Sequence, residues 1–396
     1  MVEWKKIGDI MQIVRGASPR PIKNYITSDN NGVNWIKIGD VAPGAKYITR
    51  CNEKITKEGA EKSRYLHAGD FILSNSMSFG RPYILKIDGC IHDGWIAMND
   101  YEKSVSSGYL YEILNSKVVQ DYWKMKANNG GAMTNLNSDI VRDTIIPIPS
   151  LSEQNRIVGI LDTFTASIDN LKEQIAQRRK QYEYYRDQLL DLEGKPGVEM
   201  KALNDCCTLI TKQTGFDYSK TIKPSLTTNQ NEDSIPFIQN KDFEGTRVNL
   251  NTDFYIPISV AKKFPKILLN EKILLISISG KIGNVGLYEI GNISFVGGAI
   301  CVCRLRKNIS GKYILYYLQS NKGQGSLFHS VKAASHSNIT VESIRLTTIP
   351  FPAMVEQQLI VSILDTFEAS IQNLEAQLSQ REKQYEFYRN KLLTFE

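Results

Sequence analysis

Short polar loops rich in arginine, lysine, asparagine and glutamine recur along this 396-residue chain, and they hold the side chains best suited to chemistry. Arginine and lysine bind phosphates and guanine edges, whereas asparagine and glutamine match the edge of adenine. Any one such loop is more often simply solvated, but these loops occur at similar places in two separate blocks. That recurrence favours a polyanion such as DNA as the ligand. The candidate contact residues are Arg15, Arg20, Ser76, Arg81, Lys124, Lys126, Asn129, Thr134, Asn135, Lys212, Gln213, Asn240, Lys241, Ser279, Lys281, Lys332, His336 and Asn338.

Catalytic motifs are missing from the sequence. It has no Asp/Asn-Pro-Pro-Tyr run of an amino-methyltransferase, and the Gly-Lys pairs at 280–281 and 311–312 lack the first glycine of a P-loop. The glycine-rich stretch 279–286 leads into strand-like residues, which favours a tight hairpin over a phosphate-binding loop. The Glu-Gly-Lys run at 193–195 is similar to part of a nuclease motif, but no strand is predicted around it. We therefore predict no catalytic residue in this chain.

Metal sites and disulfides are not expected either. The six cysteines form no C-x-x-C pair, and the four histidines show no ligand spacing. So few cysteines in a long chain fit a reducing cytoplasm. The chain has no run of 18 apolar residues, and its first residues do not read as a signal peptide. The sequence therefore predicts a cytoplasmic protein without a bound metal or cofactor of its own.

Positive charge is concentrated in two long blocks. The formal net charge of +6 divides into +3 over residues 1–150, −2 over 151–193, +8 over 194–352 and −3 over 353–396. Basic blocks suit a polyanion, and their acidic neighbours suggest another role; uneven surface charge is the plain alternative. A composition of 42% hydrophobic and 23% charged residues excludes disordered and collagen-like classes, and the length predicts two or three domains.

The chain contains an internal repeat. Residues 144–193 and 347–396 align without a gap at an offset of 203, with 30 of 50 positions identical. Fainter similarity links the preceding blocks, for example 69–80 with 270–283. The order is globule, helix, globule, helix, in which the helices stayed alike while the globules diverged. Such a pattern is typical of a binder that keeps one frame for two different ligands.

Each strongly repeated segment predicts a long helix. Ser150 follows a Pro-x-Pro run and precedes Glu153 by three residues, which is a helix-start signature. Apolar residues then recur at alternating steps of four and three, so a heptad seam calls for a partner helix. We expect the partner to be the other copy, running antiparallel; the alternative is that each helix packs on its own globule. The seam residues are Ile157, Leu161, Phe164, Ile168, Leu171, Ile175, Tyr182, Tyr185, Leu189, Ile360, Leu364, Phe367, Ile371, Leu374, Leu378, Tyr385, Tyr388 and Leu392.

The two remaining blocks predict a mixed α/β (α+β) fold, because short apolar runs alternate with Gly, Asn, Ser and Pro. The best strands are 71–76, 94–99, 272–279 and 298–305, and the best helices are 106–127 and 310–321. We therefore expect two globular domains separated by two long helices with pseudo-two-fold symmetry. The predicted boundaries are a first domain at 1–149, a first helix at 150–193, a linker at 194–198, a second domain at 199–352 and a second helix at 353–396.

A Pro-x-Pro, Glu-Gln, Ile-Leu-Asp pattern occurs twice, as IPIPSLSEQNRIVGILD (146–162) and IPFPAMVEQQLIVSILD (349–365). With NWIKIGDV (34–41) and GDFILSNSMSFG (69–80), it resembles the specificity subunit of type I restriction-modification enzymes. The resemblance covers the whole chain, including the order of its blocks. It implies two target-recognition domains, each reading half of a bipartite, asymmetric DNA site, held apart by two helices in an antiparallel coiled coil.

The same resemblance implies a non-catalytic scaffold. It would dock two modification subunits, which methylate adenine with S-adenosylmethionine, and up to two restriction subunits that use ATP and Mg²⁺. Base-contacting residues do not transfer, because target domains vary within that family. Two alternatives stay open: a coiled-coil adaptor whose globules bind proteins, and a self-contained DNA-modifying enzyme. Steeply salt-dependent DNA binding separates the adaptor from a DNA reader, and methyl transfer by the purified chain would support the enzyme.

Overall fold

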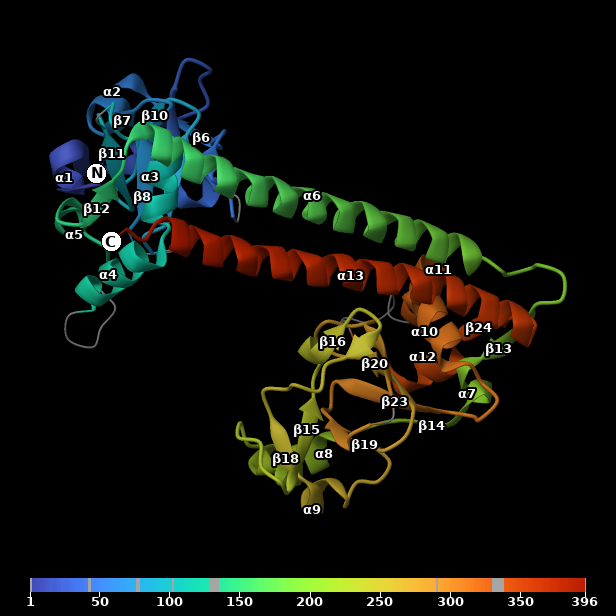
Figure 1. Cartoon of the computed structure of the whole chain (residues 1–396). Coiled ribbons are helices and arrows are strands. Elements are labelled where there is room, and N and C mark those ends of the chain that lie inside the picture. The colour runs from blue at the N-terminus through green and yellow to red at the C-terminus, as the bar shows by residue number, and fades with distance from the viewer. Residues whose placement is uncertain are drawn as a thin grey trace. The chain divides into compact units, whose positions relative to one another are not determined.

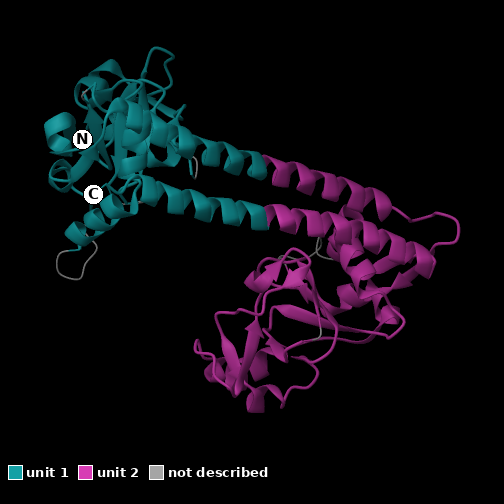
Figure 2. Ribbon diagram, in the orientation of Figure 1, with its two compact units in different colours: residues 1–172, 376–396 teal, residues 173–375 magenta. Residues whose placement is uncertain are grey.

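The computed structural model describes residues 2–41, 44–75, 79–101, 103–128, 135–289, 291–329 and 338–395. Figure 1 gives its elements, and Figure 2 shows its two compact units. Unit 1 comprises residues 1–172 and 376–396, and unit 2 comprises residues 173–375. The boundary between the units falls near the middle of both long helices, Leu151–Leu189 and Met354–Leu392. Each unit therefore contains one globule, the first half of the long helix that follows this globule in the sequence, and the second half of the other long helix.

Unit 1 contains two five-stranded sheets and one strand pair. The pair joins β1 (Glu3–Lys6) to β12 (Ile145–Ile148). One sheet has the order β3 (Ile26–Thr27), β6 (Glu53–Ile55), β4 (Val33–Ile36), β10 (Gly89–Ile91) and β7 (Arg64–Leu66). The other has the order β2 (Gln12–Arg15), β11 (Trp95–Asn99), β8 (Phe71–Ser74), β9 (Pro82–Leu85) and β5 (Tyr47–Ile48).

The β2–β11–β8–β9–β5 sheet is buried on both faces. Phe71 and Leu73 of β8 belong to one hydrophobic cluster and Ile72 to another, because successive side chains of a strand point to opposite faces. This explains why the strand reads as a continuous apolar run rather than an alternating one.

The helices of unit 1 cover the first of these clusters. The predicted helix 106–127 is interrupted: its first part ends at Leu114 with Asn115 as C-cap, and Ser116 caps the next helix, where its Oγ accepts from the Val119 amide at 3.4 Å. The short helices are α1 (Ile7–Ile10), α2 (Lys57–Glu61), α3 (Ser107–Leu114), α4 (Lys117–Ala127) and α5 (Ser138–Arg142).

Unit 2 repeats this plan with smaller sheets. A pair joins β13 (Glu199–Ala202) to β24 (Thr348–Phe351), and a hairpin joins β16 (Phe243–Glu244) to β17 (Arg247–Val248). One sheet has the order β14 (Cys207–Lys212), β23 (Ile300–Leu305), β20 (Ile273–Ser277) and β21 (Val285–Tyr288). The other has the order β18 (Tyr255–Pro257), β15 (Ser234–Ile238), β22 (Ser294–Val296) and β19 (Leu268–Leu269).

The glycine-rich stretch of unit 2 is a hairpin, as predicted. β20 and β21 pair antiparallel on either side of it, and Gly280 and Gly283 take positive φ angles of 75° and 83° that favour glycine. The helices of this unit are α7 (Leu203–Cys206), α8 (Gly215–Asp217), α9 (Ile258–Ala261), α10 (Gly311–Gln319), α11 (Asn321–Phe328) and α12 (Val341–Leu346).

The two long helices begin where the repeated motif predicts. They are α6 (Leu151–Leu189) and α13 (Met354–Leu392). Ser150 Oγ accepts from the Glu153 amide at 3.3 Å, but the Glu153 carboxylate pairs with Arg156 instead of reaching back to the cap. Gln154 donates to the Pro149 carbonyl at 2.9 Å, and the repeated glutamine of α13 makes the same bond. The Pro-x-Pro and Glu-Gln motifs therefore build the helix start.

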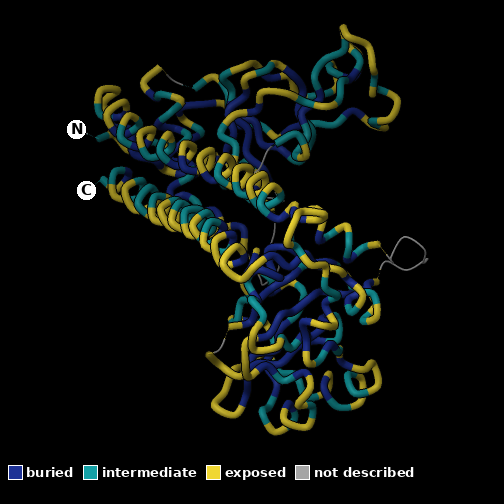
Figure 3. The backbone as a smooth tube through the Cα atoms, turned by 90° about the vertical axis from the view of Figure 1, so that its right-hand side faces the viewer, coloured by how far each residue is buried: buried dark blue, intermediate teal, exposed yellow. Residues whose placement is uncertain are grey.

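The long helices pair antiparallel within each unit. In unit 1, Phe164 stacks on Tyr388 with ring centroids 5.2 Å apart. In unit 2, Phe367 stacks on Tyr185 at 5.5 Å. The two pairs occupy equivalent positions of the repeat, so the predicted pseudo-two-fold relation holds at the level of single contacts. Figure 3 shows exposed residues along the outer sides of both helices.

The seam combines both packing schemes considered for the sequence. Arg381 lies 5.7 Å from the Phe164 ring centroid, and Arg178 lies 5.9 Å from that of Phe367, which explains why an arginine interrupts each seam. The first seam residues instead pack on the globule that precedes them: Ile157 joins the core of unit 1 and Ile360 joins that of unit 2. No helix in the described part of the chain is long and apolar enough to cross a membrane.

Candidate nucleic-acid interface

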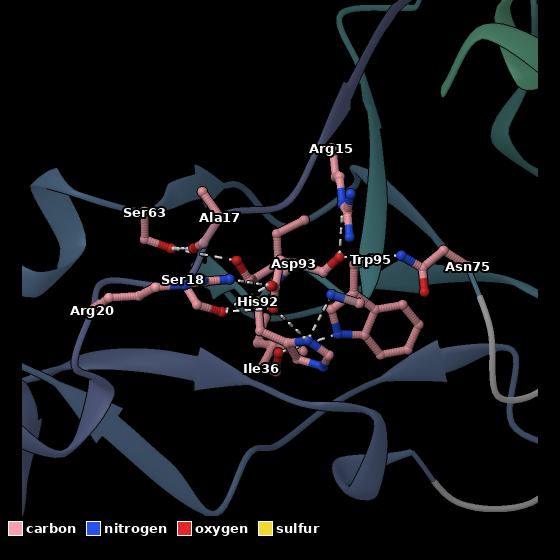
Figure 4. A network of polar contacts seen from close by, with 12 residues as sticks. Arg15, Ala17, Ser18, Arg20, Ile36, Ser63, Asn75, His92, Asp93 and Trp95 are labelled. Atoms are coloured by element: carbon pink, nitrogen blue, oxygen red, sulfur yellow. Dashed lines mark hydrogen bonds and ion pairs between the residues drawn. The ribbon is translucent and has the colours of Figure 1, made fainter. Parts of the chain in front are cut away.

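Polar side chains from three segments of unit 1 meet at Asp93 (Figure 4). Asp93 lies in the turn between β10 and β11, the stretch 15–20 runs out of β2, and Asn75 follows β8. Strands β2 and β8 flank β11 and run antiparallel to it, so their ends and its beginning share one edge of the sheet. The topology therefore brings together loops that are up to 78 residues apart in the chain.

Asp93 binds each of these segments. Its carboxylate accepts from the Ser18 hydroxyl at 2.9 Å and pairs with the Arg20 guanidinium at 3.3 Å. Its backbone carbonyl accepts from Arg15 Nε and from Asn75 Nδ2, both at 3.1 Å. The hydrogen bond from Ser18 is the largest of several effects that lower the pKa of the Asp93 carboxyl. The carboxylate is therefore charged at neutral pH and holds the loops in place.

Two glycines allow the backbones to approach closely here. A Cβ on Gly16 would lie 2.1 Å from the His92 carbonyl oxygen, and one on Gly94 would lie 2.2 Å from the His92 ring. The Gly94 amide donates to His92 Nδ1 at 2.8 Å, and burial lowers the pKa of that imidazole. His92 is thus neutral at pH 7 and acts as an acceptor that fixes the turn.

The outward part of this cluster is cationic. Arg15 is exposed, and the Arg20 side chain is 82% exposed. Two guanidinium groups on a preorganised edge, with hydroxyl and amide groups between them, can bind phosphates and base edges. We define this group of residues (Arg15, Ser18, Arg20, Asn75 and Asp93) as the Asp93 cluster.

Unit 2 has the same backbone frame at the corresponding edge. The Gly80 amide donates to the Ser74 carbonyl at 2.9 Å in unit 1, and the Gly283 amide donates to the Ser277 carbonyl at 2.9 Å in unit 2. Both loops have seven residues from the serine to the glycine. The strands before and after these loops pair in matching register, β8 with β9 and β20 with β21.

The polar side chains on this common frame differ between the units. Strand register makes Lys212 the counterpart of Arg15. Arg15 is the last residue of β2 that pairs with β11, and Lys212 is the last residue of β14 that pairs with β23. Trp95 of β11 pairs with Ser74, and Ile300 of β23 pairs with the equivalent Ser277. Asp93 lies two residues before Trp95 and Gly298 lies two residues before Ile300, so Gly298 takes the place of Asp93. Unit 2 therefore has no carboxylate at this position, and the two edges present different chemical groups.

Unpartnered amides occupy the edge of unit 2 instead. Gln213 is only 4% exposed, and neither its Oε1 nor its Nε2 has a hydrogen-bond partner among the described residues. The same holds for Asn240 Oδ1, although the Nδ2 of that amide donates to the Ser279 carbonyl. A buried polar group without a partner costs about 1–3 kcal/mol. Such groups are uncommon in folded proteins, where water or a ligand usually supplies the missing hydrogen bond.

The sequence-predicted contact residues fall into four groups. Ser76, Asn129, Thr134, Lys332 and His336 lie outside the described residues. Those that the structure brings together are Arg15 and Arg20 at Asp93 in unit 1, and Asn240 and Ser279 in unit 2; Lys281 lies in the same loop as Ser279, and Gln213 lies beside Gly298. Asn135 and Asn338 are exposed, and each precedes a residue whose backbone amide donates to a carbonyl just after β8 or β20: Leu136 donates to Asn75, and Ile339 donates to Ile278.

Of the remaining predicted residues, Lys212 lies at the edge of unit 2 in the position of Arg15, and the others lie outside the groups just described. The Arg81 guanidinium lies near the Tyr83 hydroxyl, where it lowers the pKa of that group against the larger raising effect of burial. Lys124 and Lys126 are exposed near the end of α4. Lys212 is exposed at the end of β14, and Lys241 pairs with Asp253.

Sequence reasoning missed the residue at the centre of the cluster. An aspartate is a poor candidate for binding a polyanion, so nothing in the pattern favoured Asp93. Its His-Asp-Gly turn before a predicted strand is the one available signal, and its meaning depends on which loops the sheet brings to it.

The described residues hold no group of three histidine, cysteine or acidic side chains that could bind a metal ion. All six cysteines are free thiols.

Comparison with known proteins gives a family. The sequence profile described as "Type I restriction modification DNA specificity domain" matches residues 1–178 and 196–382. A specificity subunit of a type I restriction enzyme of Escherichia coli is 33% identical over 267 residues, which cover 63% of each chain. The match therefore spans less than two thirds of that relative. A putative type I restriction enzyme specificity subunit of Haemophilus influenzae is 24% identical over 100% of this chain and 96% of its own.

Solved structures share the fold. One, described as "Structural basis underlying complex assembly and conformational transition of the type I R-M system", matches with a TM-score of 0.65 at 17% identity. The match covers 99% of this chain and 97% of that one. The type I restriction-modification S subunit of M. genitalium matches with a TM-score of 0.52 at 13% identity, over 100% of this chain and 97% of its own.

Proposed function

The chain belongs to the type I restriction-modification DNA specificity family, and we propose that it reads a bipartite, asymmetric DNA site with one half contacted by each globule. One observation carries this proposal: the same strand-end frame occurs in both units with different polar side chains on it. A shared frame presents side chains to DNA in the same way, and different side chains select different bases. The two half-sites should therefore differ in sequence.

The distribution of charge supports the same arrangement. The segments that form the globules carry +3 and +8, whereas the helical segments carry −2 and −3. Phosphates attract the globules and repel the helices. We infer that the helices act as a spacer that does not contact DNA.

The helices offer surfaces for partner proteins. Tyr184 of α6 is 62% exposed, and Phe387, at the equivalent position of α13, is 61% exposed. Exposed aromatic side chains commonly mark interaction sites. Because they occupy equivalent positions of a repeat, they suit two copies of one partner. We propose that these partners are two modification subunits, joined in some assemblies by up to two restriction subunits.

The partner subunits would then carry out the catalytic reactions. Modification subunits would bind S-adenosylmethionine and methylate adenine, and restriction subunits would bind ATP and Mg²⁺. The chain itself would act in the cytoplasm as a non-catalytic reader of DNA sequence and as a scaffold.

A domain replacement tests this function. Residues 199–352 of the full chain would be replaced by the corresponding domain of another family member, and the complex with modification subunits would be mapped for methylated sites. We expect one half of the recognised site to change and the other to stay. A change in both halves would contradict the modular reading. Binding that does not weaken steeply as salt rises would contradict DNA contact through phosphates.

A further inference from the structure

Arg15 combines exposure with a fixed side-chain direction. We propose that Arg15 reads a guanine in the half-site contacted by the first globule, and that Asp93 is the positioning residue that aims it. The inference rests on the proposed function and adds the identity of one base and the residue that selects it. Three features of the structure support it: the hydrogen bond that Arg15 makes, the rigidity of its anchor, and the contrast with Arg20.

The hydrogen bond of Arg15 leaves its base-reading end available. Nε donates to the Asp93 carbonyl at 3.1 Å, and no other described residue forms a hydrogen bond or ion pair with this guanidinium. The two terminal nitrogens therefore remain free on an exposed side chain. Their parallel N–H groups match the O6 and N7 acceptors of guanine, which is the commonest specific contact in the major groove. Adenine presents a donor in place of O6 and cannot accept both bonds.

The anchor of Arg15 is held from several directions. The backbone carbonyl of Asp93 also accepts a hydrogen bond from Asn75 Nδ2, and the side-chain carboxylate of Asp93 accepts one from the Ser18 hydroxyl. Behind Arg15, the Gly16 amide donates to the Trp95 carbonyl at 2.9 Å. Much of the conformational entropy of the arginine is thus lost before DNA arrives, which favours a specific contact over a loose one.

Arg20 differs in a way that makes it a matched control. Its guanidinium pairs with the Asp93 carboxylate at 3.3 Å, and its side chain is 82% exposed. Its contact is with the charge of Asp93 rather than with a fixed backbone carbonyl. We therefore assign Arg20 to the phosphates, which carry no base identity.

The second globule lacks this arrangement. Lys212 stands at the position of Arg15, and Gly298 replaces Asp93. A lysine ammonium does not present two parallel N–H donors in one plane as a guanidinium does. In addition, the turn beside Lys212 has no carboxylate that would hold the side chain in a fixed direction. Lys212→Gln should therefore leave the guanine of the first half unchanged, which provides a second control.

The test is a selection from a fully randomised duplex DNA library, with the full chain in complex with modification subunits. Wild-type protein, Arg15→Gln, Arg20→Gln, Lys212→Gln and Asp93→Ala would be compared by sequencing the bound DNA. Thermal unfolding would verify that each variant folds. Exchange of residues 199–352 would show independently which half-motif belongs to the first globule.

We expect a guanine at one position of the first half-motif in the wild type. Arg15→Gln should lower preference for that guanine by about 5-fold to 150-fold, as for the loss of one bidentate contact. Asp93→Ala should lower the same preference partly and leave the second half-motif intact, which a general loss of structure would not do. Arg20→Gln should weaken binding to all sequences alike and reduce its salt dependence.

Two results would overturn the assignment while leaving the proposed function in place. One is a bipartite wild-type motif without guanine in the first half. The other is a guanine whose preference survives Arg15→Gln. A wild-type selection that yields no motif would instead contradict the proposed function itself.

Discussion

Replacing Tyr385 by phenylalanine should destabilise unit 1 by an amount that depends on the charge of Glu112. Glu112 lies on α3 and is 2% exposed, and the Tyr385 hydroxyl of α13 donates to its Oε2 at 2.8 Å. Burial is the main cause that raises the pKa of Glu112. Lys46 and Arg389 lower the pKa of Glu112, and Asp162 raises it.

The magnitude follows from the kind of hydrogen bond lost. A bond to a charged acceptor contributes about 1.5–3 kcal/mol, and one between neutral groups about 0.5–1.5 kcal/mol. Above the folded-state pKa, where Glu112 is ionised, Tyr385→Phe should thus lower the free energy of unfolding by about 1.5–3 kcal/mol. In a Glu112→Gln background the same change should cost only about 0.5–1.5 kcal/mol. The difference, about 1 kcal/mol, is the expected coupling.

The coupling should depend on pH in a defined direction. Because the folded-state pKa of Glu112 is raised, stability from this group is present below its unfolded pKa and is lost as pH rises through the folded value. Glu112→Gln should therefore gain stability relative to wild type as pH rises. The coupling with Tyr385 should shrink as pH falls and Glu112 becomes protonated.

Urea unfolding of the four variants at pH 8 and pH 4.5 measures these effects. Tyr388→Phe is the matched control on the same helix, since its hydroxyl has no hydrogen-bond partner among the described residues, and it should change stability little. Equal costs of Tyr385→Phe in both backgrounds at every pH tested would refute the reasoning, as would a coupling that grows on acidification.

Further predictions concern the two edges and the helix surface. Gln213→Leu removes an unpartnered buried amide and should raise the free energy of unfolding by about 1–2 kcal/mol in urea titrations, while weakening DNA binding; a loss of stability would contradict it. Gly16→Ala places a Cβ against a backbone carbonyl and should lower that free energy by about 1–3 kcal/mol. Phe387→Ser should change stability by less than about 0.5 kcal/mol. Paired with Tyr184→Ser, it should abolish co-purification with modification subunits, and unchanged recovery would exclude this surface.

The long helices were predictable because one period governs each of them. A heptad seam that recurs at a fixed offset predicts that the two copies of the helix pack against each other. The stacked pairs Phe164–Tyr388 and Phe367–Tyr185 confirm the antiparallel arrangement. The central strands were also predictable, since buried strands read as continuous apolar runs. Two-residue strands such as β3 and β16 could not be predicted from the sequence, because two residues show no periodicity and become a strand only by pairing with a neighbouring strand in the folded protein.

The candidate site was predictable only in part. Basic and amide residues in glycine-containing loops indicated Arg15, Arg20, Gln213 and Asn240, which the structure places at corresponding edges of the two sheets. Asp93 could not be found this way, because its role depends on strand order rather than on its own chemical type. Arg81 and Lys281 occur in matching loops, but the structure aligns Arg81 with residue 284, so the two are not equivalent positions.

The exchange of half-helices between units has a consequence for synthesis. Unit 2 is built from one continuous stretch, 173–375, whereas unit 1 needs residues 376–396 to complete it. On the ribosome the second globule can thus acquire its full set of contacts before the first. At about 5–20 residues per second, the interval between making residue 172 and residue 396 is roughly 10–45 s. During that interval the buried surface that Tyr385 and Leu393 cover in unit 1 is open to chaperones or to other copies of the chain.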